Sequence, residues 1–481
     1  MAYRNTFFRW LFLYSLTFGL TYVLKLFTYL CPETGHTCPL DYMPVFARKE
    51  AVIETEAVKM YVEDERCYCS HPTGVHSNGI CPFKVAYGEG QMPRDHHFSG
   101  SDAVQRGARH GLNSNRKMTS KERMLCAIEG GIPDRLPVTV HQWQPYHLKT
   151  YMNGMSDIEA NKACGLDASI NVFSVSGEES DTWKVSSTRE QREGFYVKHY
   201  TIETPDGILT TSEGISPMTS WVMEHLIKKE EDIHLLRKYR PVPKLDRKLA
   251  VQTYDALGED GILRTFIWGK QGGCWQDACE LYGVENLILM TYDDPEWVHE
   301  LLQILLEQKL AYIEENLPGM PFDLVETGGG ASSNTVISPD IHEEFCLPYD
   351  IKMHDALKKH GFRSVYHTCG GMTRIADLIA KNHCSVSETL SPVAVGGDIG
   401  NRADEQKVYN ALHPFVGLIG GMDQFHILET GTKKEIETEV RRLYESFGLD
   451  GGYILSACDH FFEVPPQNLR YFSDAAKHIF Y

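Results

Sequence analysis

The sequence of 481 residues has no long uncharged apolar run and is short of basic residues. The best apolar segment, residues 7–30, is uncharged only over residues 10–24, whereas a membrane-spanning helix needs roughly 20 such residues. Its length suits the apolar part of a signal peptide, but no small-residue cleavage site follows it. With 47 Lys and Arg against 65 Asp and Glu, the net charge is -18. This balance argues against nucleic acid as a partner, because phosphate binding needs a basic face.

Disulfide and nucleotide-binding patterns are also missing. An odd total of 13 cysteines, scattered through a long chain, is a poor disulfide framework. We therefore expect a reducing, cytoplasmic location, in which a special cysteine is a metal ligand or a nucleophile. No GxGxxG opens a helix and no Walker A motif occurs, which argues against the nucleotide-binding folds.

A change in composition near residue 117 divides the chain into two parts. Residues 1–117 are almost neutral, and residues 71–117 are rich in Gly, Ser, His, Asn and Pro. We interpret them as an N-terminal extension, while segment 7–30 leaves an interfacial helix or an uncleaved anchor open. The five cysteines of this part match no zinc-finger spacing. Residues 118–481 indicate a folded domain, which begins with a helix capped by Thr119 or Ser120.

The domain alternates short apolar strands with amphipathic helices, which indicates parallel strands joined by crossover helices. Helix-start signals precede several of the helices: Asp294-Pro295, Ser338-Pro339 and a Thr432/Glu435 capping box. Nearly every strand ends in polar, glycine-rich sequence. Such ends meet at one rim of an α/β barrel, whereas a doubly wound sheet makes only the ends near a switch point special. The sequence therefore predicts a (β/α)8 TIM barrel, with strands at 262–268, 323–327, 363–368, 385–389, 415–420 and 452–457.

Three residues at these strand ends form a candidate metal site. His367 and Cys369 end one strand, and Cys458 ends the last one. Side chains two residues apart point to the same side of a strand, so the first two can reach one ion. Nitrogen with thiolates favours zinc over magnesium or calcium, and three protein ligands leave a fourth position open for catalysis. The alternative is that both cysteines are small buried strand residues.

Several segments after Met118 resemble the uroporphyrinogen decarboxylase superfamily, and in particular its zinc- and corrinoid-dependent methyltransferases. The region that contains them covers about three quarters of the chain, and the segments are MTSKERMLCAIEGGIPDRLPV, SPDIHEEFCLPYDIKMHDALKKHG, VYHTCGG, GGMDQFHILETGTKKEIETEV and GGYILSACDHFFEVPPQNL. The resemblance implies zinc ligands at His367, Cys369 and Cys458. That superfamily usually reads GYILxxGC, whereas here the cysteine comes one residue earlier, in GYILSAC.

The resemblance also implies catalytic carboxylates and a substrate pocket at this rim. Glu388, at the end of SVSETL, is a candidate fourth ligand or a plain rim carboxylate. Glu326, in ETGGG, is a candidate acceptor for the ring proton of the ligating histidine. His141, Trp143 and His147 indicate an uncharged, partly aromatic substrate pocket, although each is equally compatible with a packed barrel residue.

The decarboxylase itself is a competing interpretation. Those enzymes share an arginine-bearing MRQAGRY segment, and the corresponding HQWQPYH, residues 141–147, has no arginine to pair with substrate carboxylates. A non-catalytic barrel that serves as a membrane-tethered scaffold is a further alternative, against which the intact HTC and SAC segments argue.

Two methyltransferase chemistries remain open. In one, zinc binds a thiol that takes a methyl group from a methylated corrinoid; in the other, zinc acts as a Lewis acid on a methyl donor, whose methyl group passes to cobalt(I). ETGGGASS, SETLSP and SACDHFF are more similar to the branch that O-demethylates methoxylated aromatics. No DxHxxG corrinoid-binding module occurs, so we expect the corrinoid (cobalamin) on a separate partner protein.

Overall fold

The structure, a computed structural model, describes residues 117–269 and 271–481. The predicted extension, with its apolar segment 7–30 and its five cysteines, lies outside the described residues, and the boundary at residue 117 stays a prediction. Among the described helices, none is both long and apolar enough to cross a membrane.

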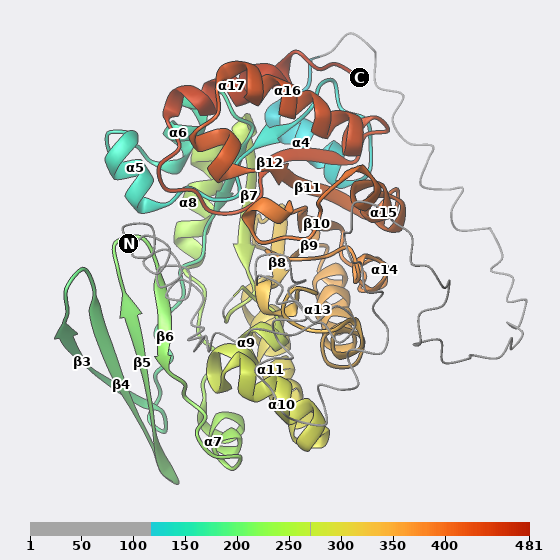
Figure 1. The fold of residues 1–481 in the computed structure, drawn as a ribbon. Helices are drawn as coiled ribbons and strands as arrows, with labels where there is room; N and C mark the ends of the chain where they lie inside the picture. Colours follow the sequence, from blue (N-terminus) through green and yellow to red (C-terminus); the bar gives the residue numbers. More distant parts are fainter. Residues whose placement is uncertain (1–116, 270) are drawn as a thin grey trace, which may run out of the picture. The chain divides into compact units, whose positions relative to one another are not determined.

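Eight parallel strands form one sheet in the order β1-β12-β11-β10-β9-β8-β7-β2 (Figure 1). The two end strands also meet, because the amide of Asp167, just before β2, donates to the carbonyl of Val138 on β1 over 2.8 Å. The predicted (β/α)8 TIM barrel is therefore confirmed, and the six predicted strands correspond to β7 through β12. The strands are β1 Val138–Thr139, β2 Ala168–Asn171, β7 Gly261–Phe266, β8 Leu324–Gly328, β9 Ser364–His367, β10 Val386–Thr389, β11 Gly417–Met422 and β12 Tyr453–Ala457.

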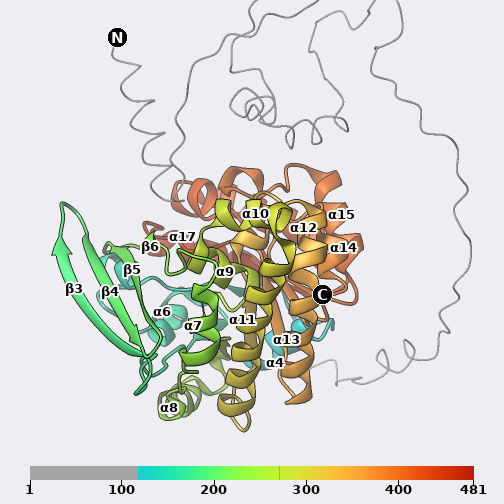
Figure 2. The ribbon, with the colours of Figure 1, turned by 90° about the horizontal axis from the view of Figure 1, so that it is seen from below.

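Helices surround this sheet (Figures 1 and 2). They are α4 Ser120–Ile128, α5 Pro145–Tyr151, α6 Asp157–Cys164, α7 Asp232–Tyr239, α8 Arg247–Leu257, α9 Cys274–Tyr282, α10 Val284–Asp293, α11 Pro295–Asn316, α12 Pro339–Ile341, α13 Leu347–Lys359, α14 Ala376–Ile379, α15 Arg402–Leu412, α16 Lys433–Leu443 and α17 Pro466–Lys477. Short turns are η2 Gly258–Asp260, η3 Gly330–Ser332, η4 His342–Cys346, η5 Val393–Val395, η6 Gln424–Glu429 and η7 Tyr444–Gly448. The expected caps are confirmed, since the side chains of Thr119, Asp294, Ser338 and Thr432 each accept a backbone N–H.

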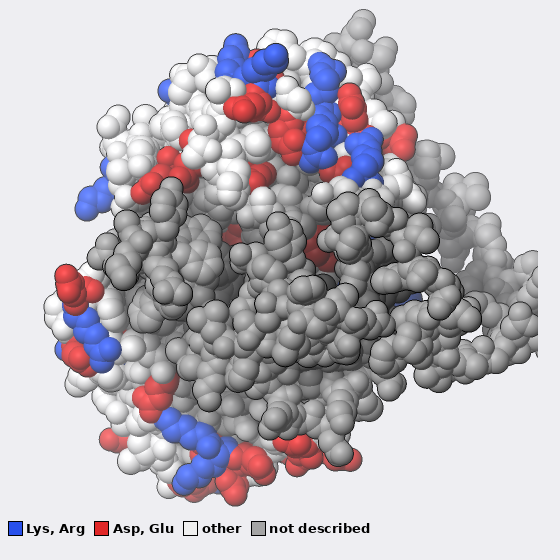
Figure 3. Space-filling model, viewed as in Figure 1, with Lys and Arg blue, Asp and Glu red and all other residues white. Residues whose placement is uncertain are grey.

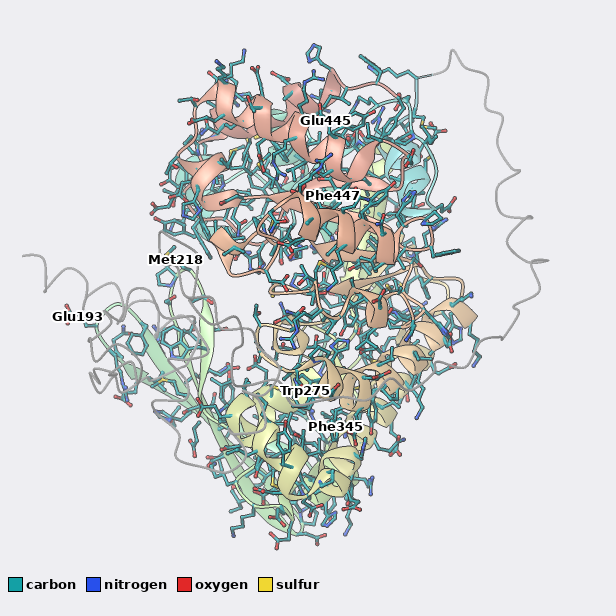
Figure 4. The ribbon with its side chains drawn as sticks, turned by 45° about the vertical axis from the view of Figure 1, so that its right-hand side comes forward. Glu193, Met218, Trp275, Phe345, Glu445 and Phe447 are labelled. Carbon is teal, nitrogen blue, oxygen red and sulfur yellow. The ribbon has the colours of Figure 1, made fainter. Side chains whose placement is uncertain are left out.

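The longest helix, α11, packs against its neighbours α9 and α13. Helices α11 and α13 lie side by side in Figure 2. Trp275 of α9 and Phe345 of η4 lie close together, with ring centroids 6.2 Å apart (Figure 4). This apolar layer fixes the helix that follows β7 against the helix that precedes β9.

Helix α4 closes the amino-terminal end of the barrel. Its buried side chains, with Met124 and Ile128 among them, pack against one inward residue from each of six strands. Those residues are Ile262, Leu324, Val365, Val386, Ile419 and Ile454. Because strand side chains alternate with period two, the residue two positions further along each strand faces the same interior. On four neighbouring strands those next residues are polar, so a water-excluding apolar layer supports a polar layer: Arg264, Glu326, His367 and Glu388.

A four-stranded antiparallel sheet, which the sequence analysis did not predict, is inserted between β2 and α7. Its order is β3-β4-β5-β6, with β3 Lys184–Gln191, β4 Tyr196–Thr204, β5 Gly207–Ile215 and β6 Ser220–Glu224. It stands beside the barrel, and Figure 4 shows Glu193 and Met218 in its hairpin turns. The insertion starts at the carboxyl end of β2, which is the end at which TIM barrels carry their sites. Figure 3 shows acidic and basic side chains interspersed on the described part of one face.

Candidate functional site

The polar layer above α4 is a buried network of charged residues. Arg264 Nη2 donates to Glu326 Oε2 over 2.8 Å and to Glu388 Oε1 over 2.9 Å. All three side chains are only 1% exposed, so the guanidinium is what makes two buried carboxylates tolerable. Burial and the charge of Glu388 raise the pKa of Glu326. Burial acts in the same direction on Glu388, but the Arg264 guanidinium and the hydrogen bond with His367 hold the pKa of that carboxyl well below its usual range.

His367 has the orientation of a metal ligand. Its Nδ1 lies 3.0 Å from Glu388 Oε1, while its Nε2 is buried without a hydrogen-bond partner. Histidines that bind metals usually donate the other ring N–H to a carboxylate, which fixes the ring and the tautomer. Burial alone would lower the pKa of His367, but Cys369 and Glu388 raise it. Glu388 therefore holds one ring nitrogen of His367, and the other is buried without a hydrogen-bond partner, as expected of a metal ligand.

Glu388, and not Glu326, holds the ring of His367. Glu326 was expected to accept the His367 ring proton, but its Oε1 lies 3.9 Å from Nδ1 and the carboxylate is bound by Arg264. Glu388, expected as a possible fourth ligand, is the residue that contacts Nδ1. Glu388 therefore contacts His367 directly, whereas Glu326 is connected to this pair through Arg264.

Cys369 and Asp459 complete a group with the histidine. Single ligand atoms of His367, Cys369 and Asp459 all lie within 4.8 Å of one another. The Asp459 side chain is 29% exposed, so the group opens to solvent at the mouth. Although burial works to raise the pKa of Asp459, His367 and the backbone N–H of His460, which donates to Asp459 Oδ1 over 2.7 Å, lower it. A second group of this kind consists of His141, Asp459 and His460.

The third predicted ligand, Cys458, is not brought to this group. Its side chain is completely buried, and its Sγ lies 3.9 Å from the carbonyl oxygen of Leu390. Burial raises the pKa of the Cys458 thiol. Among the described residues, three groups are compatible with a metal ion: two contain Asp459, the third consists of the buried His141, Glu326, His367 and Glu388, and none contains Cys458.

Of the predicted substrate residues, one lies at the site and two lie in the core. The ring centroid of His141 is 4.9 Å from that of His367, and burial lowers the pKa of His141 to about 3, so it is neutral. Trp143 and His147 pack around Phe461, with ring centroids 5.5 and 4.9 Å from it. His147 Nε2 also lies 2.7 Å from the carbonyl oxygen of Val464, as expected of a packed structural histidine.

The residues present fit a zinc ion. An imidazole with an unpartnered Nε2, a partly exposed thiol and a carboxylate are all zinc donors, and the cluster lies at the carboxyl end of the strands, where an open position can face substrate. Close approach of the β8 loop is part of this arrangement. A Cβ at Gly330 would lie 2.8 Å from Cys369 Sγ, so a larger residue there would press on the sulfur.

Comparison with known proteins agrees with the barrel fold. Residues 215–479, more than half of the chain, match the sequence profile of the uroporphyrinogen decarboxylase (URO-D) family. The chain belongs to the uroporphyrinogen decarboxylase family. This confirms the superfamily indicated by the sequence segments, and the similar relatives described next are methyltransferases.

Two of these relatives are archaeal methyltransferases. A methylcobamide:CoM methyltransferase MtbA of Methanosarcina acetivorans is 24% identical over 263 residues, which are 54% of this chain and 72% of that protein. MtbA of Methanosarcina mazei is 24% identical over 153 residues, or 31% of this chain and 40% of that protein. Among solved structures, a methyltransferase from Methanosarcina mazei matches with a TM-score of 0.50 and 14% identity, and the match covers 75% of this chain and 98% of that one. This last likeness shows the shared fold.

Three residues of the site were missed from the sequence: Arg264, Asp459 and His460. Arg264 lies within an apolar strand. The only available signal was its position two residues after Ile262, which places its side chain on the same inward face of the strand. Asp459 and His460 directly follow the predicted Cys458 in the SACDH segment, and the structure brings Asp459, not Cys458, close to His367 and Cys369. The alternation of side chains along a strand does not extend beyond Ala457, where β12 ends, so it does not predict which side chain after it reaches the site.

Proposed function

We propose that this protein is a zinc-dependent methyltransferase that moves a methyl group between a small methyl donor, a methoxylated aromatic, and a corrinoid on a separate protein. The observation that carries the proposal is the buried, unpartnered Nε2 of His367, held by Glu388 beside Cys369 and Asp459 at the barrel mouth. The relatives named methylcobamide:CoM methyltransferase support the involvement of a corrinoid. The eight free cysteines of the described residues support our proposal of a cytoplasmic location.

The chain's own residues would bind and orient the donor. Glu388, itself held by Arg264, keeps the His367 ring in one orientation. His141 is neutral, so it offers a hydrogen bond to the donor without adding positive charge that would attract carboxylates. A bound zinc ion would supply a Lewis acid for the leaving oxygen of the donor. The corrinoid of the partner protein would supply the cobalt(I) electron pair that accepts the methyl group, while the electron pair of the broken carbon–oxygen bond would stay on the donor oxygen.

The opposite direction, from methylated corrinoid to a thiol, is the second candidate. It is favoured by the names of the two relatives, which act as methylcobamide:CoM methyltransferases. Decarboxylation has weaker support, since Arg264 is already committed to two glutamates and is not available to pair with a substrate carboxylate. A non-catalytic scaffold would have no reason to keep an unpartnered ligand nitrogen beside a thiol and a carboxylate.

The test uses purified zinc-loaded protein with a reduced corrinoid protein. A panel of methoxylated aromatics and methyl amines is added, and conversion of cobalt(I) to methylcobalt(III) is followed by absorbance. A parallel reaction offers a thiol acceptor with methylated corrinoid. We expect turnover with methoxylated aromatics. Turnover with the thiol alone would assign the second candidate, and decarboxylation of uroporphyrinogen without added metal would exclude both.

A further inference from the structure

We propose that the metal ion of this protein is held by His367, Cys369 and Asp459, so that a carboxylate takes the place of a second thiolate. The inference rests on the proposed function for the presence of a metal ion. It goes further in naming the ligand set and, through it, the class of methyl donor that the site accepts.

The geometry of the group is the first support. The only metal-compatible group of described residues that contains both His367 and Cys369 has Asp459 as its third member, with the ligand atoms within 4.8 Å of one another. His367 Nε2 is fully buried and lacks a hydrogen-bond partner, which identifies a candidate ligand atom independently of the carboxylate. His460 Nδ1 lies 3.4 Å from Asp459 Oδ1, and its Nε2 lies 3.1 Å from Gln142 Oε1. The carboxylate is therefore oriented by a neighbouring imidazole that is itself held in place.

The environment of Cys458 is the second support. The Cys458 amide still donates to the carbonyl of Met422 over 3.0 Å, so this residue continues the β12 ladder. Its thiol is fully buried, its Sγ lies near the carbonyl oxygen of Leu390, and it belongs to none of the metal-compatible groups of described residues. Asp459 is the first residue beyond the ladder, and its side chain reaches the partly exposed mouth.

The ligand set has a consequence for the substrate. Thiolate ligands donate electron density to zinc, whereas a carboxylate is a harder and weaker donor. A site with one thiolate is therefore a stronger Lewis acid toward oxygen than a site with two, and it activates a bound thiol less. We infer that Asp459 adapts this barrel to methyl ethers, in which the leaving oxygen needs stabilisation, in preference to thiol acceptors.

The experiment measures metal binding in the full chain, so that it does not depend on finding the substrate. Zinc affinity is measured by competition with a chromophoric chelator for the unchanged protein, Asp459→Asn, Cys458→Ser, Cys458→Ala and Cys369→Ser. The protein is also loaded with Co2+, because the thiolate-to-cobalt absorption reports sulfur ligands directly. Thermal melts of the metal-free variants show whether each one folds.

We expect Asp459→Asn and Cys369→Ser to weaken zinc binding by about 100-fold or more, since even loss of a residue behind a ligand costs 10- to 100-fold. Both Cys458 variants should bind zinc like the unchanged protein and keep the full thiolate-to-cobalt absorption, which only Cys369→Ser should abolish. Asp459→Cys should increase that absorption by adding a second thiolate.

Two results would overturn the inference. Loss of zinc in both folded Cys458 variants, with full binding by Asp459→Asn, would restore the two-thiolate site and leave the proposed methyl transfer intact. A failure of the unchanged protein to bind zinc or cobalt at all would refute the metal in both proposals.

Discussion

Replacement of Arg264 by methionine is a sharp test of how the buried layer is built. Arg264 is 1% exposed and is the shared hydrogen-bond donor of Glu326 and Glu388. Methionine has a similar length and fills the space without charge or donor. In Arg264→Met both carboxylates stay buried, and Glu388 keeps only the neighbouring His367 and His141 rings, 3.0 and 3.6 Å from its Oε1.

The expected loss follows from this geometry. Removal of one partner of a buried ion pair costs about 3–5 kcal/mol, because the remaining charge is left uncompensated. A domain of about 365 residues unfolds with an entropy of about 0.77 kcal/mol/K, so the melting temperature should fall by about 4–6 °C. Because Glu388 then loses one of the contacts that fix it behind His367, zinc affinity should also fall, by about 10- to 100-fold.

Calorimetry and zinc competition measure these two effects on the same samples. A surface variant, Lys359→Met, removes an ion pair with Glu314 that is largely exposed, and it should leave the melt almost unchanged. The double variant with Glu326→Gln should recover part of the loss, since one buried charge is removed together with its partner. If Arg264→Met melted within a degree of the unchanged protein, the two carboxylates would not depend on this guanidinium and the reasoning would be refuted.

Three further predictions concern other parts of the chain. Gly330→Ala should weaken zinc binding with little change in the melt, since its Cβ would lie 2.8 Å from Cys369 Sγ; Gly177→Ala, with open surroundings, is the control for the same titration. Burial lowers the pKa of His354 to about 3, so between pH 6.5 and 3 only the unfolded chain binds the extra proton, and the free energy of unfolding falls as the pH is lowered. His354→Gln should reduce the slope of the free energy of unfolding against pH by about 1.4 kcal/mol per pH unit in denaturant titrations, and an unchanged slope would contradict this prediction. A chain that begins at Met118 should be soluble, melt cooperatively and contain the same zinc; insolubility would show that the boundary is misplaced.

The sequence by itself determined the barrel and the position of its mouth. Short apolar strands, capped helices and polar strand ends are local signals, and each depends on residues within one or two turns of one another. Thr119, Asp294, Ser338 and Thr432 could be read as caps because a capping side chain bonds backbone only two or three residues ahead. The HTC segment likewise showed His367 and Cys369 together, since strand parity relates residues two positions apart.

Only the tertiary structure decided which distant residues meet. Arg264 and Glu388 are 124 positions apart in the sequence, and closure of the barrel is what brings them within 2.9 Å. The same closure places Glu388 against Nδ1 of His367 and Glu326 against Arg264. At the end of β12 the ladder stops, so the choice between Cys458 and Asp459 depends on how the chain turns there and on which side chain is buried. Local alternation predicts the face of a strand residue, but the contacts of a loop residue follow from the packing around it.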